Sequence, residues 1–121
     1  MPDDQDGAGL RRTGPAPSRT LSPELLAGLR TAFAGEVDRR LPRLRRLRQD
    51  PDQQVLAQAL RDVHSLASSA AVVGADELSR CAARVETGLQ RCLSDPAAGF
   101  PAPVAADAEQ LTALLEAWQP P

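Results

Sequence analysis

A chain of 121 residues is long enough for one domain with a single modest hydrophobic core, and three aromatic residues in all leave that core to aliphatic side chains. A formal net charge of -2 gives no overall attraction to nucleic acid or to an anionic membrane. No stretch approaches the roughly 20 apolar residues of a membrane span, and the acidic start from Met1 to Asp6 is unlike a secretory signal, so we expect a cytoplasmic protein.

The first twenty residues are rich in Asp, Gly, Pro and Arg and have no apolar periodicity, which predicts a disordered tail over residues 1–20. We expect the folded domain to occupy residues 21–119. Its first helix should begin at Ser22, whose hydroxyl is a good N-cap, followed by a proline and an acid at the positive end of the helix dipole, Pro23 and Glu24.

Apolar residues of this first helix recur every three or four positions and predict one buried stripe, formed by Leu26, Leu29, Phe33, Val37, Leu41, Leu44 and Leu47. Pro42 interrupts the helical pattern. Because proline has no N–H, Pro42 should leave the carbonyl of Asp38 unpaired and kink the helix or break it into two pieces.

Six arginines lie within ten residues of the same helix, namely Arg39, Arg40, Arg43, Arg45, Arg46 and Arg48. Leucines are interleaved with them, so we assign the arginines to the solvent side of the helix. A solvated face is favoured over attraction to an acidic partner. Binding to RNA or DNA is the least favoured of the three interpretations, because the chain is acidic overall and lacks aromatic residues for base stacking.

A second helix should open after a very short turn, with Asp50 as N-cap, Pro51 at the first helical position and Gln53 as the reciprocal capping residue. Gly74 should end it. The buried stripe of this helix is expected to consist of Leu56, Ala59, Leu60, Val63, Ala67 and Ala70.

A third helix is predicted from about Ala75 to Leu93, with Leu78, Cys81, Val85 and Leu89 buried. A loop with proline and glycine follows from Ser94 to Pro103. The fourth helix should run from about Val104 to Trp118 and bury Val104, Ala108, Leu111, Leu115 and Trp118. Four amphipathic helices with mostly short connections predict an all-α fold, an antiparallel up-down four-helix bundle.

The two cysteines, Cys81 and Cys92, are eleven residues apart and lie on nearly the same face of the third helix. On such a face they are more often small core residues than a disulfide or a metal pair. One histidine cannot supply the rest of a zinc site, so we expect no metal on this chain.

His64 is the only histidine and the only side chain suited to carry a reactive group near neutral pH. The buried stripe of the second helix centres near Val63, so His64 should lie at the edge between core and solvent, neither buried nor free. Taken alone, such a histidine is more often a boundary residue without chemistry. Its neighbours, however, are small and leave room for a partner's active site: Ser65, Ala67, Ser68, Ser69 and Ala71.

The stretch around this histidine resembles the histidine-containing phosphotransfer (HPt) family. The family pattern is His-x-Leu-Lys-Gly, small residues, Gly-Ala, then a leucine and a Leu-Glu pair on the next helix. Ala67 stands at the family's lysine and Ser68 at its first glycine, and both depart from the pattern. The resemblance extends from about Leu21 to Trp118, and the residues that match are His64, Leu66, Gly74, Ala75, Leu78, Val85 and Glu86.

The resemblance implies a phosphocarrier of a two-component phosphorelay, without turnover of its own as an enzyme. Nε2 of His64 would accept the phosphoryl group from the aspartate of a response-regulator receiver domain or from a hybrid histidine kinase. The Mg²⁺ ion would lie on the partner receiver, and this chain, expected to be a monomer, would hold no cofactor.

Two side chains are candidates to assist His64. Glu86, at the family's glutamate position, would orient the imidazole through Nδ1; the alternative is a solvated surface acid. Arg61 could replace the missing ammonium at Ala67 as a phosphate contact, or be an ordinary surface arginine. The partner-binding surface would comprise Arg61, Ser65, Ala67, Ser68 and Ala71.

Two other functions stay open. Because Ala67 removes the family's lysine, the chain could be a phosphorylation-incompetent adaptor, a pseudo-HPt bundle that binds a receiver or kinase. The arginines between Arg39 and Arg48 leave a basic-helix nucleic-acid binder as a second alternative.

Overall fold

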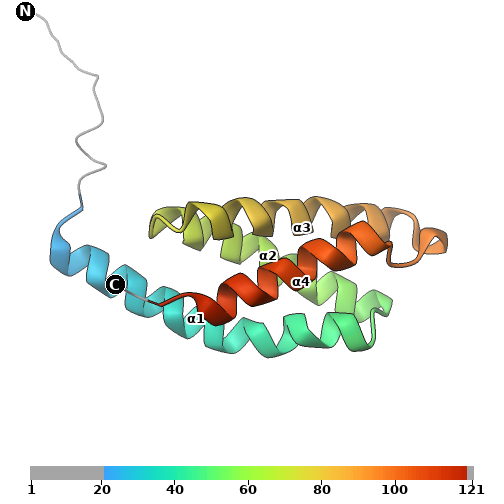
Figure 1. Cartoon of the computed structure of the whole chain (residues 1–121), viewed down its shortest axis with the longest axis horizontal. Coiled ribbons are helices and arrows are strands. Elements are labelled where there is room, and N and C mark those ends of the chain that lie inside the picture. The colour runs from blue at the N-terminus through green and yellow to red at the C-terminus, as the bar shows by residue number, and fades with distance from the viewer. Residues whose placement is uncertain (1–20, 120–121) are drawn as a thin grey trace, which may run out of the picture.

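A computed structural model describes residues 21–119 and places them in an all-α fold. Its elements are α1 (Pro23–Gln49), α2 (Gln53–Val72), α3 (Asp76–Ser94), the short 3-10 helix η3 (Pro96–Ala98) and α4 (Ala102–Ala117). The four α-helices run alternately in opposite directions and lie side by side (Figure 1). The predicted up-down four-helix bundle is confirmed. The tail predicted for residues 1–20 lies outside the described residues.

α1 is one continuous helix of 27 residues, so of the two effects expected of Pro42, a kink or a break into two pieces, the break does not occur. Proline removes a single backbone hydrogen bond, and the apolar stripe keeps its place on both sides of it. Leu41 packs against the core, and Leu44 and Leu47 are buried there. The axis of α1 changes direction along its length (Figure 1). The start at Ser22 is confirmed, since its Oγ accepts a hydrogen bond from the Leu25 N–H at 3.1 Å.

The turn between α1 and α2 differs from the prediction in its capping residue. Asp50 is the C-cap of α1, and its N–H donates to the Arg46 carbonyl at 2.9 Å. The N-cap of α2 is Asp52, which accepts from the Val55 N–H at 2.9 Å. Because α1 continues to Gln49, the chain needs two further residues to turn, and the second aspartate caps the helix instead of the first.

Gly74 ends α2 as predicted, with a φ of 79° that favours glycine. The Gly74 N–H donates to the Ala71 carbonyl at 3.1 Å, and the Ala75 N–H donates to the Ala70 carbonyl at 2.8 Å. This pair of bonds is a Schellman motif, which turns the chain directly into α3. The observed bounds of α3 and α4 differ from the predicted ones by one or two residues.

The predicted stripes form one aliphatic core in the middle of the bundle. On α3 the four predicted residues are buried, together with Ala82, Gly88 and Cys92. Cys81 and Cys92 are buried free thiols, and burial raises the pKa of both. Trp118 packs edge-on against Phe33, with ring centroids 4.8 Å apart, and joins the end of α4 to α1.

The observed core departs from the predicted one at several positions, of which three bear on the site. Leu26 is only half-buried and lies outside the core cluster. On α2, Leu66 and the charged residue Asp62 are completely buried, although neither belongs to the predicted stripe. The true buried face of α2 is therefore wider than the predicted stripe and is shifted toward α1.

The solvated face expected for the arginines of α1 is observed for Arg39, Arg45, Arg46 and Arg48, which are exposed, whereas Arg40 and Arg43 are half-buried and depart from it. Arg40 and Arg43 pair with a carboxylate of α2. On the other side of α1, exposed ion pairs reach α4, from Arg45 to Glu116 at 2.6 Å and from Arg48 to Glu109 at 2.8 Å. The arginines lie on both sides of the narrow apolar stripe of α1, where acidic side chains of α2 and α4 are within reach. Arg39 and Arg46 form no ion pair within residues 21–119.

Residues 21–119 hold neither a membrane span nor a cluster of metal ligands. None of the helices is long and apolar enough to cross a membrane. No three His, Cys, Asp or Glu side chains in this part of the chain are grouped so that they could hold a metal ion.

Candidate functional site

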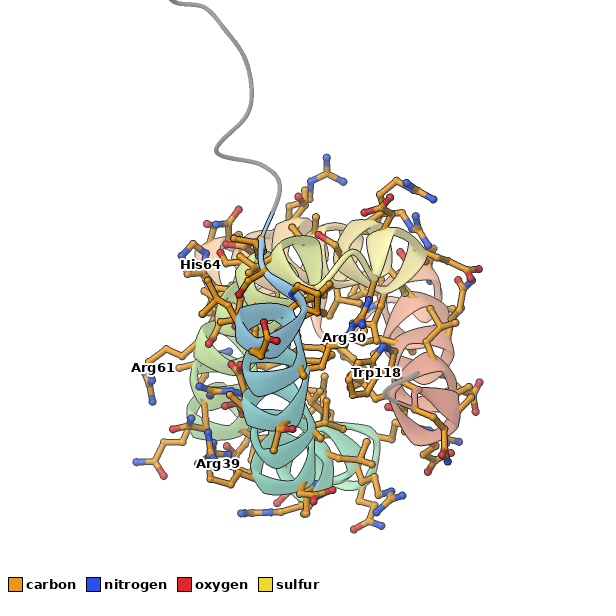
Figure 2. All side chains as sticks on the ribbon, turned by 90° about the vertical axis from the view of Figure 1, so that its left-hand side faces the viewer. Arg30, Arg39, Arg61, His64 and Trp118 are labelled. Atoms are coloured by element: carbon orange, nitrogen blue, oxygen red, sulfur yellow. The ribbon has the colours of Figure 1, made fainter. Side chains whose placement is uncertain are left out.

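His64 lies on the outer surface of α2, and its side chain is 71% exposed (Figure 2). The prediction placed His64 at the edge of the core, so its imidazole is more exposed to solvent than expected. The physical reason is the burial of Asp62 and Leu66, which turns the centre of the buried face of α2 away from His64. A partner molecule can therefore reach the ring directly.

Glu86 of α3 meets this imidazole. Its Oε2 lies 2.7 Å from Nδ1 of His64, and its side chain is only 21% exposed. A carboxylate accepts hydrogen bonds, so Nδ1 carries the proton in the neutral ring. The other nitrogen, Nε2, then keeps its lone pair. The predicted pair of His64 and Glu86 is thus brought together in the geometry of an oriented nucleophile.

The helix pair that carries these two side chains is the most extensively packed pair in the bundle. Beyond the core, the Ser79 hydroxyl donates to the Ala67 carbonyl at 2.8 Å and ties α3 to α2 one turn from His64. The Schellman turn at Gly74 closes the same hairpin. Short connection, apolar packing and this side-chain link together hold Glu86 opposite His64.

The structure separates the other predicted partner-binding residues. Ser68 and Ala71 are exposed and continue the surface of α2 beyond His64, whereas Ala67 is half-buried against the core. Arg61 is exposed, but its Nη2 donates to Gln58 Oε1 at 2.8 Å. Its guanidinium points away from His64 (Figure 2). In this arrangement Arg61 contacts Gln58 and not the imidazole of His64, and its role as a phosphate contact stays a prediction.

Ser65, the fifth predicted docking residue, is turned toward α1. Its hydroxyl donates to Glu36 Oε2 and accepts from Arg40 Nη2 at 3.2 Å. Arg40 also donates through Nε to Glu36 Oε2 at 2.9 Å. Ser65 therefore belongs to the contact between two helices and is not a free part of the docking surface.

A buried carboxylate completes this contact. The Asp62 side chain has no exposed surface, and its Oδ1 accepts from Arg40 Nη1 at 2.6 Å and from Arg43 Nη2 at 2.9 Å. Gln58 Nε2 lies 3.4 Å from the same oxygen. We call the group the polar seam, and it consists of Glu36, Arg40 and Arg43 on α1 with Asp62 and Ser65 on α2.

The seam favours the charged forms of Glu36 and Arg40. Burial acts to raise the pKa of Glu36, but hydrogen bonds from Ser65, Ser69 and Arg40 outweigh it and hold that pKa below its ordinary value. Burial also acts to lower the pKa of Arg40, and its bonds to Asp62 and Glu36 reverse the shift. The seam is therefore an ionic network between α1 and α2.

The seam was not predicted from the sequence, although a signal was present. Glu36, Arg40 and Arg43 follow a spacing of four and three residues, which places them on one face of α1. On α2, Asp62 lies three residues from Ala59 and so shares the buried face. A charged residue in register with a buried stripe indicates a buried ion pair.

Comparison with known proteins adds one finding. The family model of the Hpt domain matches residues 21–119, which include all four helices as well as His64 and Glu86. No curated protein and no solved structure matches the chain. The family match, the bundle and the exposed histidine agree, and the chain belongs to the Hpt domain family, whose members have a phosphotransfer role in two-component signalling.

Proposed function

We propose that this chain is a cytoplasmic phosphocarrier in which Nε2 of His64 accepts a phosphoryl group from a receiver-domain aspartate or a histidine kinase and passes it on. The observation that carries the proposal is the exposed imidazole of His64 with its Nδ1 on Glu86 Oε2 at 2.7 Å. This arrangement leaves the second ring nitrogen unprotonated and open to solvent.

The chemistry requires little from the bundle. Nε2 attacks the phosphorus of an aspartyl phosphate in line, the N–P bond forms, and the O–P bond breaks with the carboxylate as leaving group. The transition state is loose, and the receiver with its Mg²⁺ supplies most of the charge neutralisation. The ring becomes positively charged as it takes the phosphoryl group, and the Glu86 carboxylate 2.7 Å from Nδ1 stabilises that charge.

The missing lysine at Ala67 keeps the adaptor function as a second candidate. Within residues 21–119 no arginine forms a hydrogen bond or ion pair with His64, and Arg61 is bonded to Gln58. To serve as a phosphate contact, Arg61 must exchange Gln58 for the phosphoryl oxygens, which its exposed position allows. An adaptor needs no such exchange.

The nucleic-acid alternative loses its main support. Four of the six arginines between Arg39 and Arg48 are engaged by carboxylates of α1, α2 or α4. Their charge is largely neutralised within the bundle.

The test is transfer from labelled, phosphorylated receiver domains of the source genome to the full chain. We expect label that is labile in acid and stable in alkali, and none on His64→Gln, which keeps the exposed position polar and leaves the core intact. Label retained by His64→Gln would move the chemistry to another residue. Receiver binding without any label would establish the adaptor, and salt-sensitive binding to nucleic acid alone would establish the third alternative.

A further inference from the structure

The polar seam joins α1 and α2 at a high cost in desolvation free energy. Asp62 is fully buried, and within residues 21–119 neither its Oδ2 nor the buried Nε of Arg43 has a hydrogen-bond partner. Taking charges out of water costs more than an incompletely bonded network returns, and apolar residues of similar volume often do as well or better. The seam is therefore poorly explained as a source of stability.

Its location suggests a different role. Asp62 and Ser65 bracket His64 in the sequence, and both bind α1 while His64 meets Glu86 of α3. Charge-assisted hydrogen bonds depend on direction, whereas apolar contacts tolerate small rotations. The seam consequently fixes the rotation of α2 about its own axis at the level of the histidine.

A small rotation is enough to break the histidine contact. Side-chain atoms lie roughly 5–6 Å from a helix axis, so a turn of about 10° moves them by about 1 Å. Nδ1 of His64 and Oε2 of Glu86 are 2.7 Å apart, and a further ångström takes them beyond hydrogen-bond distance. The orientation of the imidazole on one side of α2 thus depends on the contacts that another side of α2 makes with α1.

We propose that Asp62 and Ser65 are positioning residues for phosphotransfer, because their bonds to Arg40 and Glu36 set the rotation of α2 that holds His64 on Glu86. The proposal rests on the phosphocarrier function for its effect on transfer. Its structural part, the orientation of the imidazole, is measurable in the absence of transfer.

The first experiment reads the tautomer of the imidazole by ¹⁵N NMR. The chain has one histidine, so every imidazole signal belongs to His64. We expect the Nδ1–H form in the wild type and a mixture of the two tautomers in Asp62→Asn. The control is Arg45→Gln, which removes one charge from α1 on the side away from the polar seam, where Arg45 pairs with Glu116, and it should retain the wild-type tautomer.

The second experiment measures transfer from a phosphorylated receiver as a function of receiver concentration. Asp62 is buried and cannot touch a receiver, so Asp62→Asn should lower the saturated rate about tenfold and change half-saturation less than twofold. If Asp62 acts through the contact between His64 and Glu86, adding Asp62→Asn to Glu86→Gln should lower the transfer rate of Glu86→Gln by less than a further factor of two. Arg45→Gln should leave both quantities unchanged.

Ser65→Ala tests the same device if Asp62→Asn does not fold, and Ser65→Thr, which keeps the hydroxyl, should restore the wild-type tautomer and rate. The proposal is overturned if folded Asp62→Asn and folded Ser65→Ala both show the wild-type tautomer. It is also overturned if Asp62→Asn lowers the transfer rate by the same factor in the wild type and in Glu86→Gln. A wild type that takes no label contradicts the phosphocarrier function instead, and the tautomer measurement then decides the positioning role by itself.

Discussion

α2 meets its two neighbours through contacts of opposite kinds. With α3 it shares an extensive apolar core, in which all buried residues of α3 are apolar or small. With α1 it shares the polar seam, whose central carboxylate is buried and only half satisfied. The contact with α3 contributes free energy of folding through apolar burial, and the contact with α1 fixes the rotation of α2 about its own axis. A helix that must present one side chain at one angle benefits from both.

The largest expected effect lies in the apolar core. Leu66 is completely buried, and Leu66→Ala should lower the free energy of unfolding by about 3 kcal/mol through lost burial and the cavity that remains. The seam still orients α2 in this variant, so transfer at a temperature where it is folded should stay within twofold of wild type. Urea unfolding and the transfer assay measure the two quantities. A tenfold loss of transfer would mean that apolar packing also sets the angle.

The seam should respond in the opposite way. Asp62→Leu should change the free energy of unfolding by less than about 1 kcal/mol, because it removes the cost of burying the carboxylate and the two arginines that lose this partner are themselves partly exposed. Arg40 keeps Glu36 as a partner, and Arg43, already 41% exposed, can turn to solvent. Transfer should nevertheless fall about tenfold. Destabilisation as large as that of Leu66→Ala would show that the seam is chiefly a structural element.

Acid should weaken the seam through Glu36. Its pKa in the folded protein lies below the ordinary value of 4.5, so the unfolded chain binds this proton at a higher pH than the folded one. The stability that Glu36 contributes is fully present above about pH 4.5 and is lost as the pH falls through the lower, folded pKa. Urea unfolding across this range should show a shallower acid slope for Glu36→Gln than for the wild type. Identical slopes would contradict the assignment.

The smallest effect is expected at the contact between α1 and α4. The ion pair of Arg45 and Glu116 is about half exposed on both sides, and such surface pairs contribute about 0.5 kcal/mol or less. Arg45→Gln should therefore leave both stability and transfer close to wild type. A marked loss of transfer would extend the positioning role beyond the seam to the whole of α1.

The helices could be predicted from the sequence because apolar periodicity and turn residues act locally, as at Ser22 and Gly74. Local signals fail where two residues compete for one role: Asp52 and not Asp50 caps α2, because Asp50 is the C-cap of α1. His64 and Glu86 were paired by family resemblance, since residues 22 positions apart on different helices leave no joint local signal.

The seam was missed for a related reason. A stripe is recognised by its apolar members, so Asp62 was not counted as buried, and its arginine partners lie 19 and 22 residues away. Only the packed bundle shows that these charges meet. The exposure of His64 had the same origin, because the position of the buried face depends on Asp62 being inside it.

The edge-on contact of Trp118 with Phe33 makes α1 observable by light. Trp118 is the only tryptophan, so the intrinsic fluorescence of the chain reports on the junction of α4 with α1. The contact of α1 with α4 is less extensive than those of α2 with α3, α1 with α2 and α3 with α4, so local opening is expected to begin at this junction. A change in emission that precedes the loss of far-ultraviolet dichroism on heating would report such opening, in a protein that carries no added label.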